Sequence, residues 1–337
     1  MFKDTQMISV SVIMPVYNNA DFLSSAIESI TQQTLKNFEL LIMDDGSTDN
    51  SLEIANKEAE KDKRIKVFPR TNRKVASCLN ELATLAKSEF IARMDGDDLA
   101  HPKRLEKQLA YLKLYSDTAV VGSWVQTFGK KQETWHFRKW DNYSRNLLFF
   151  GVTILCHPTW MLKKSLLLKY PYDDSFRFII DREWLARVAI NEPMLKFVAL
   201  PEVLLDYRMH EASVSGQNEI QQRLKTNKVI KQYLSAYQVD LTDEEVELFT
   251  SISFAEVINP INLELAGKLI ERIHLTISGV LNDDFKVFRE KWLKFCVANE
   301  ALHLAKKYLV DNDFVFFIEK SDVSKPLKKA PLNANND

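Results

Sequence analysis

Short apolar runs and amphipathic stretches alternate along the first third of the chain. The apolar runs are typical of buried strands, and they cover residues 8–16, 38–43, 65–68 and 89–94. Between them lie three stretches that we expect to be helices, at residues 22–30, 51–60 and 74–86. Strands that alternate with helices need crossover connections, so this order predicts an α/β domain with a mostly parallel sheet flanked by helices.

The pattern changes near residue 217. Before that point we expect a helix at 103–115, a strand at 119–128 and a helix at 182–191. Beyond it glycine is rare and Lys, Glu and Leu are frequent, which predicts a helical region. We therefore divide the chain into an α/β domain, residues 1–216, and a C-terminal helical region, residues 217–337. The α/β domain has halves of about 1–115 and 116–216, and the later helices are expected near 219–236, 242–251, 263–278 and 284–309.

Composition narrows the class of protein. A hydrophobic fraction of 46% and a charged fraction of 27% are typical of an ordinary soluble globular protein. The net charge of -1 gives no global attraction to nucleic acid, so we expect no nucleic-acid partner. The three widely spaced cysteines favour reduced thiols in the cytoplasm. The chain has no apolar signal segment at its start and no apolar stretch long enough to span a bilayer, so we expect a cytoplasmic protein.

An unusual group of acids follows the fourth expected strand. The segment Arg93-Met94-Asp95-Gly96-Asp97-Asp98 places three carboxylates within four residues. Like charges this close repel one another unless water or a cation neutralises them. Oxygen ligands favour Mg²⁺ or Mn²⁺, ions that usually bridge to the phosphates of a substrate. For an isolated Asp-x-Asp, however, an Asp-rich turn before a helix is the more frequent explanation.

Two further polar segments strengthen the case for a binding site. Residues 15–18 and 44–49 also follow expected strands, and in parallel sheets ligands lie beyond the carboxyl ends of the strands. The first glycine of the chain is Gly46, which excludes a glycine-rich phosphate loop after the first strand. A tyrosine beside two acid-rich strand ends is therefore interpreted as a site for a ribonucleotide and a metal ion.

Three of these segments together closely resemble the family 2 glycosyltransferases of GT-A fold. They are Ser-Val-Ile-Met-Pro-Val-Tyr-Asn at 11–18, Asp-Asp-Gly-Ser-Thr-Asp at 44–49 and Ala-Arg-Met-Asp-Gly-Asp-Asp at 92–98. Their order and spacing match the family over about the first hundred residues. The resemblance implies a UDP-sugar donor, Mn²⁺ or Mg²⁺ as cofactor, and transfer of one sugar with inversion at the anomeric carbon.

The resemblance also assigns the donor site. Tyr17 would stack on uracil, and Asp45 would accept a hydrogen bond from its N3–H. Asp95 and Asp97 would bind the metal, with His210 as a further ligand. The other nucleotide contacts that it implies are Pro15, Asn18, Asp44, Asp95 and Lys74, the last of which is glycine in many family members.

The catalytic base is assigned by a later motif. Residues 178–187 resemble the family's Glu-Asp-x-Asp-Leu-Trp helix start, in which Asp181 takes the position of the base and Ile180 replaces the first acid. A carboxylate there can accept a hydroxyl proton while backbone N–H groups position it. The structural alternative is that Asp181 caps the helix at 182–191.

Two other motifs extend the resemblance. Residues 155–161 resemble the family's Cys-His-Pro-Ser strand, which places His157 and Trp160 on the acceptor side, although a lone histidine is as often structural. Residues 205–215 resemble its Tyr-Arg-x-His-x-x-Ser-x-Ser motif. Arg208 and His210 alternate on a strand and would reach the diphosphate or the metal. A structural pair with a carboxylate is the alternative for Arg208.

The helical region carries an aromatic stripe with two interpretations. Core packing is the default, and attachment to an anionic membrane surface is the alternative, because the family often acts on lipid-linked glycans of lipopolysaccharide or capsule synthesis. That attachment would make the protein peripheral at the inner face of the cytoplasmic membrane. The stripe comprises Phe285, Phe288, Trp292, Phe295 and Leu302. The tail lysines Lys325, Lys328 and Lys329 would add only modestly to attachment at an anionic membrane.

Two other functions compete with the transfer of a single sugar. A processive polysaccharide synthase needs membrane-spanning helices and a Gln-x-x-Arg-Trp motif, and the sequence has neither. A non-catalytic subunit that binds a nucleotide or a glycan on the same fold stays open as the alternative, although the intact Asp95, Asp97, Asp181 and His210 favour an enzyme.

Overall fold

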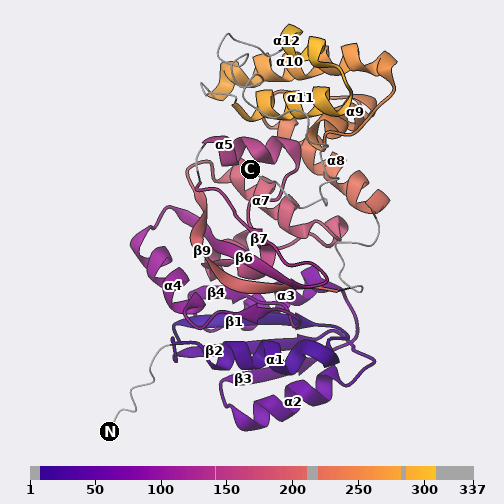
Figure 1. The fold of residues 1–337 in the computed structure, drawn as a ribbon. Coiled ribbons are helices and arrows are strands. Elements are labelled where there is room, and N and C mark those ends of the chain that lie inside the picture. The colour runs from indigo at the N-terminus through magenta and orange to yellow at the C-terminus, as the bar shows by residue number, and fades with distance from the viewer. Residues whose placement is uncertain (1–7, 141, 211–218, 282–285, 309–337) are drawn as a thin grey trace. The chain divides into compact units, whose positions relative to one another are not determined.

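The computed structural model describes residues 8–140, 142–210, 219–281 and 286–308 (Figure 1). These residues pack into two compact units. Residues 142–153 and 185–191 belong with the C-terminal helices, although they lie within the segment 1–216. Within the described residues, the first unit comprises 8–140, 154–184 and 192–210, and the second comprises 142–153, 185–191 and 219–308.

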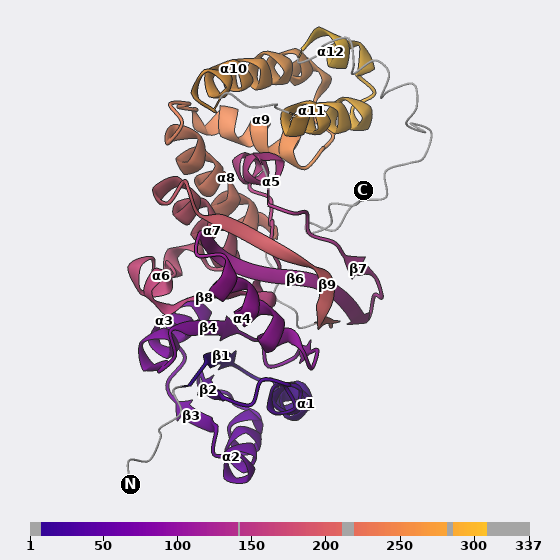
Figure 2. The same cartoon turned by 90° about the vertical axis from the view of Figure 1, so that its left-hand side faces the viewer.

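The first four strands form the parallel sheet that the apolar runs predict. The register pairs Val16 with Asp44 and Ile13 with Arg93, so the polar segments after these strands lie at one edge. Helices α1 (Ala20–Thr31) and α2 (Ser51–Lys61) cover one face of this sheet, and α3 (Val75–Leu85) covers the other (Figure 2). The strands, in spatial order, are β3 (Ile65–Pro69), β2 (Phe38–Asp44), β1 (Val10–Val16) and β4 (Phe90–Arg93).

The sheet continues beyond β4 with mixed pairing. Strand β8 (Met161–Lys163) pairs antiparallel with β4 and with β6 (Thr118–Gly129). Strand β9 (Lys196–Met209) runs parallel to β6 along its length (Figure 2). The short β5 (Leu99–Ala100) then pairs antiparallel with β9, which sets Leu99 opposite Asp206. This pairing brings the loop after the acid cluster beside the strand that carries Arg208 and His210. The small β7 (Thr134–Trp135) pairs with β6.

Helix α7 (Ile180–Asn191) begins two residues earlier than expected. Asp181 is therefore the second residue of the helix, and the prediction that it could be the N-cap is wrong. The N-terminal helices follow the predicted apolar faces; α1 buries Leu23, Ala26, Ile27 and Ile30. The other short helices of the first unit are α4 (Arg104–Leu114), α6 (Lys164–Lys169), and the 3₁₀ turns η2 (His157–Thr159) and η3 (Asp174–Phe176).

The second unit is helical, as predicted for the C-terminal region. Phe288, Trp292 and Phe295 have no exposed surface, so core packing is confirmed for this part of the stripe, and these rings cannot face a lipid surface. Phe285 and the three tail lysines lie outside the described residues. The elements are α5 (Asn142–Leu147), η1 (Leu148–Phe150), α8 (Glu219–Ser235), α9 (Asp243–Ser253), η5 (Pro260–Asn262), α10 (Leu263–Leu281), α11 (Lys286–Ala298) and α12 (Leu302–Lys307).

Across the described ranges, every helix is too short or too polar to cross a lipid bilayer.

Candidate active site

Asn18 ties together the loops that follow β1 and β2. Its backbone N–H donates to Ser47 Oγ at 3.0 Å, and its Oδ1 accepts from the Thr48 N–H at 2.8 Å. A φ of +54° at Asn18 permits this turn, since asparagine adopts the left-handed region more readily than most residues. Half of the Tyr17 surface remains exposed, so its ring is available for stacking at this edge of the sheet, next to the partly buried Pro15.

The two acids at the end of β2 have different partners. Asp44 is buried and accepts the Ser47 N–H at 3.0 Å, so it shapes the loop after β2. Asp45 accepts the Arg70 Nε–H at 2.8 Å and the backbone N–H groups of residues 73 and 74 at 2.9 and 2.8 Å. These bonds fix the loop between β3 and α3 against the end of β2. Lys74, at the end of that loop, is exposed and has a φ of +73°.

Three carboxylates converge after β4. One oxygen from each of Asp95, Asp97 and Asp98 lies within 4.8 Å of the others. Asp98 is almost fully buried, and its Oδ1 accepts the Arg208 N–H at 2.9 Å. Its Oδ2 has no hydrogen-bond partner among the residues that the structure describes. A buried carboxylate oxygen without a donor, beside two more carboxylates, fits a hard divalent cation such as Mg²⁺ or Mn²⁺. The sequence predicted Asp98 as one of three clustered carboxylates, but only Asp95 and Asp97 were named from it as acidic metal ligands.

Two arginines and a histidine contact the acid cluster. Arg93 forms an ion pair with Asp95 at 2.6 Å, and His210 Nε2 lies 2.9 Å from Asp97 Oδ2. The Arg208 Nε–H donates to the Asp97 carbonyl oxygen at 2.8 Å. Both residues expected at the diphosphate therefore lie at the cluster, and the remainder of their motif, residues 211–215, lies outside the described residues. The sequence did not lead us to expect a role for Arg93. Its position two residues before Asp95 was a usable signal, because residues two apart on an extended segment point to the same side.

Arg208 is also held by aromatic rings. Its guanidinium carbon lies 4.3 Å from the centroid of the Phe22 ring and 4.4 Å from that of Phe128. The rings and the Asp97 carbonyl together fix the direction of this side chain.

Burial makes the ionised forms of Asp95 and Asp98 costly. Burial raises the pKa of Asp95 to about 6; Arg93 opposes the shift, and the charge of Asp97 adds to it. Burial also raises the pKa of Asp98 well above its ordinary range, with further contributions from Asp97 and Asp95. A divalent cation would stabilise the ionised form of all three acids, so the residues present fit such an ion.

The expected acceptor-side residues form an aromatic group. His157 Nε2 lies 2.8 Å from the Tyr172 hydroxyl oxygen, and the His157 ring meets the Trp160 ring edge-on at 4.5 Å. Burial lowers the pKa of His157 well below its ordinary value, so the imidazole is neutral near pH 7. Trp160 has no exposed surface; it supports His157 and offers no face to an acceptor. Tyr172 is a member of this group that the sequence did not indicate.

The charge of Asp181 acts on two of the groups that the charge of Asp95 also reaches, Tyr172 and Cys156. Burial raises the pKa of Tyr172 and of Cys156, and the negative charges of Asp95 and Asp181 add to both shifts. Both carboxylates are thus within electrostatic reach of the same two groups. Asp181 is partly exposed and accepts no hydrogen bond from the described residues, which leaves its carboxylate available to take a proton.

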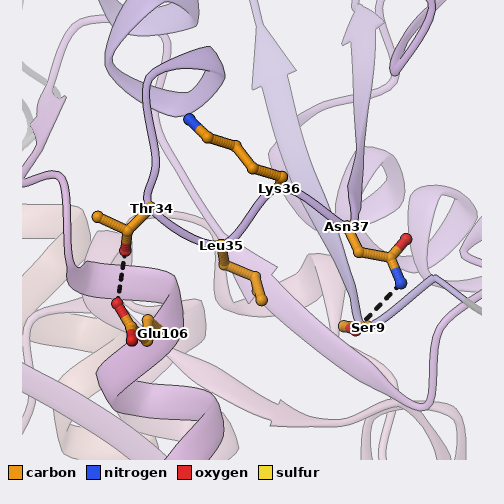
Figure 3. Close-up of a pocket in the computed structure, with 6 residues that line it drawn as sticks. All are labelled: Ser9, Thr34, Leu35, Lys36, Asn37 and Glu106. Carbon is orange, nitrogen blue, oxygen red and sulfur yellow. Dashed lines mark hydrogen bonds between the residues drawn. The ribbon is translucent and has the colours of Figure 1, made fainter.

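A separate hollow lies at the opposite edge of the sheet. It has a volume of about 480 Å³ and lies at the amino ends of β1 and β2 (Figure 3). Its walls are joined by hydrogen bonds from Thr34 to Glu106 at 2.7 Å and from Asn37 to Ser9 at 3.3 Å. None of the expected site residues lines it, so it is not the candidate active site.

Solved structures identify the class of this fold. The chain superposes on residues 1–349 of Staphylococcus aureus TarS, in complex with UDP-GlcNAc, with a TM-score of 0.60 and 17% identity, covering 88% of this chain and 91% of that TarS fragment. It also superposes on the mannosyltransferase PcManGT from Pyrobaculum calidifontis (in complex with GDP-Man and Mn²⁺) with a TM-score of 0.53 and 17% identity, covering 91% and 89%. The fold is therefore that of the GT-A glycosyltransferases, as the sequence implied.

Sequence comparison defines the family. The model of glycosyl transferase family 2 matches residues 11–170. The Escherichia coli O-antigen biosynthesis glycosyltransferase WbnJ is 34% identical over 209 residues, which cover 60% of this chain and 81% of WbnJ. The chain belongs to glycosyl transferase family 2.

Proposed function

We propose that this glycosyltransferase moves a single sugar from a UDP-sugar to a hydroxyl of a glycan or lipid-linked glycan, with inversion at the anomeric carbon. The proposal is carried by the cluster of Asp95, Asp97 and Asp98. It is supported by the Asp181 carboxylate, whose charge reaches the same two groups, Tyr172 and Cys156, as that of Asp95. Asp181 removes the proton of the acceptor hydroxyl while its oxygen attacks the anomeric carbon. The bond to the diphosphate breaks on the opposite face, so an α-linked donor gives a β-linkage.

The acid cluster provides the metal site. Asp95 and Asp97, joined by Asp98 and His210, would hold Mn²⁺ or Mg²⁺, and a bound ion would supply positive charge where the departing diphosphate gains negative charge. His210 orients the Asp97 carboxylate through their 2.9 Å contact. Arg208 fixes the loop by its bond to the Asp97 carbonyl and lies close enough to assist at the diphosphate.

The donor nucleotide is assigned to the ends of β1 and β2. Tyr17 stacks on the base, and Asp45 accepts its N3–H. The fold by itself does not select the nucleotide, because TarS was solved with UDP-GlcNAc and PcManGT with GDP-Man. We propose UDP because Asp45, at this edge of the sheet, can accept the N3–H of uracil.

The acceptor is proposed to be a cell-surface polysaccharide precursor, supported by the similarity to an O-antigen enzyme. A peripheral contact with the inner face of the cytoplasmic membrane would then use the exposed side of α10. Leu265 and Leu275 are 55% and 65% exposed there and flank the exposed Lys268 and Arg272, a pattern suited to an anionic surface.

Metal-dependent donor hydrolysis tests the function. Wild-type protein incubated with UDP-Gal, UDP-Glc, UDP-GlcNAc or UDP-GalNAc and Mn²⁺ is expected to hydrolyse one of them slowly and to stop when EDTA is added. Release of UDP is the measurement. A binding subunit would release none from any donor, and that result would favour the non-catalytic alternative.

The role of Asp181 is tested with the same donor and an acceptor. Asp181→Asn is expected to retain the affinity for UDP while turnover falls about a hundredfold or more. Asp117→Asn, which removes an exposed acid paired with Lys196, is the control and should retain both properties. Near-normal turnover in Asp181→Asn would place the base elsewhere.

A further inference from the structure

The hydrogen-bonding capacity of Asp45 is almost fully used by the protein. An ionised carboxylate offers about four lone-pair positions, two on each oxygen. Its Oδ1 accepts both the Arg70 Nε–H at 2.8 Å and the Arg73 N–H at 2.9 Å. Among the residues that the structure describes, the N–H group that donates to its Oδ2 is that of Lys74, at 2.8 Å. One oxygen is therefore saturated, and the other has a single position left.

Arg70 cannot easily release the saturated oxygen. Its Nη1 forms an ion pair with Glu81 at 2.7 Å, and its Nη2 donates to the Cys78 sulfur at 3.0 Å. Only 10% of the Arg70 side chain is exposed. Burial, with the charge of Asp45 adding to it, raises the pKa of Cys78 to about 12, so this partner stays a neutral thiol. Glu81 and Cys78 thus hold the guanidinium against Asp45 Oδ1.

The bases differ in how many donors they present to a carboxylate. Uracil offers one donor, N3–H, between two carbonyl acceptors. Guanine offers two adjacent donors, N1–H and the 2-amino group, which would need a free position on each carboxylate oxygen. Cytosine and adenine place an unprotonated ring nitrogen beside their amino group. The lone pair of that nitrogen would repel the carboxylate oxygens, because both are hydrogen-bond acceptors. A carboxylate with one free position therefore suits uracil.

We propose that Arg70 is a positioning residue that sets nucleotide specificity, because it occupies one oxygen of Asp45 and leaves room for a single base donor. This inference rests on the proposed function, in which Asp45 accepts the base. A guanine nucleotide would leave one donor unpaired at a nearly buried acid, and such a loss weakens binding about tenfold or more.

Wild-type protein gives a test that no folding defect can obscure. Its dissociation constants for UDP, GDP and inosine diphosphate are measured by titration calorimetry with Mn²⁺. The hypoxanthine base of inosine diphosphate keeps N1–H and lacks the 2-amino group. It is expected to bind more tightly than GDP, and UDP to bind at least about tenfold more tightly than GDP. Tighter binding of GDP than of inosine diphosphate would overturn the inference, since Asp45 would then accept both donors.

Substitution of Arg70 tests the residue itself. Arg70→Met frees Asp45 Oδ1, and the ratio of the GDP to the UDP dissociation constant is expected to fall about tenfold. Arg70→Lys keeps a donor toward Asp45 and should retain part of the preference. A purely structural role would weaken both nucleotides equally and leave the ratio unchanged, which would also overturn the inference.

Arg64→Met is the matched control. Arg64 precedes the other end of β3, where it forms an ion pair with Asp62 at 2.6 Å and packs over the Phe38 ring at 4.2 Å. This substitution should leave the ratio unaltered. Failure of wild-type protein to bind any of the three nucleotides would refute the proposed function together with this inference, whereas UDP binding without the expected ratios would refute the inference alone.

Discussion

Lys74 has a backbone conformation that a side chain makes costly. Its φ of +73° and ψ of 163° fall in a region that is almost restricted to glycine, and residues held there cost about 1–3 kcal/mol. The N–H of Lys74 donates to Asp45 Oδ2, so the strain serves to aim this donor. The same geometry explains why glycine is frequent at this position in the family that the sequence resembles.

Lys74→Gly should therefore stabilise the protein. Relief of the strain exceeds the extra entropy that glycine gives the unfolded chain, so we expect a gain of about 1 kcal/mol in the free energy of unfolding. Urea denaturation measures it. Lys63→Gly, at an exposed position without a positive φ, should be slightly destabilising instead. A loss of stability in Lys74→Gly would show that the Lys74 side chain contributes more than the strain removes.

At the scale of elements, a buried glutamate joins the strands at the edge opposite the active site. Glu39 in β2 accepts hydrogen bonds from Ser11 Oγ in β1 at 2.7 Å, from the Lys87 N–H at 2.7 Å and from Lys66 in β3 at 2.6 Å. Burial alone would raise the pKa of Glu39, but these three bonds lower it below its ordinary value of 4.5.

This arrangement predicts that acid weakens the sheet. Because the folded-state pKa is the lower one, the stability from Glu39 is present above about pH 4.5 and is lost as the pH falls through the folded-state pKa. Glu39→Gln should be less stable than wild type by about 1–3 kcal/mol at pH 7. Urea denaturation at pH 7 and pH 3 should show this difference shrinking in acid. An equal difference at both pH values would contradict the assignment.

At the scale of the whole molecule, the site residues and the C-terminal aromatic core belong to different units. The acid cluster, Asp45 and Asp181 all lie in the first unit. In the second unit, Phe288 packs against Phe150 at 4.8 Å and Phe149 at 6.0 Å between ring centroids. The second unit therefore has a core of its own.

Phe288→Leu should separate stability from nucleotide binding. The smaller side chain leaves space in the second unit, so we expect a loss of about 1 kcal/mol in stability and a lower melting temperature. The dissociation constant for UDP, measured by calorimetry below the melting range, should not change. A severalfold change would mean that the donor site depends on the core of the second unit.

The sequence by itself determined the order of strands and helices in the first hundred residues and the location of Pro15, Asn18, Asp45 and Asp95 at strand ends. These features depend on residues that are neighbours along the chain, and periodicity records such local relations directly. It also identified the glycosyltransferase family through motifs that are contiguous in sequence.

Only the tertiary structure decided which distant residues meet. Asp98 meets Arg208, 110 residues away in the chain, because β5 pairs with β9. The contact of His157 with Tyr172 and the burial of the aromatic stripe of α11 arise in the same way. Such contacts depend on the pairing and packing of whole elements, and no local pattern specifies them.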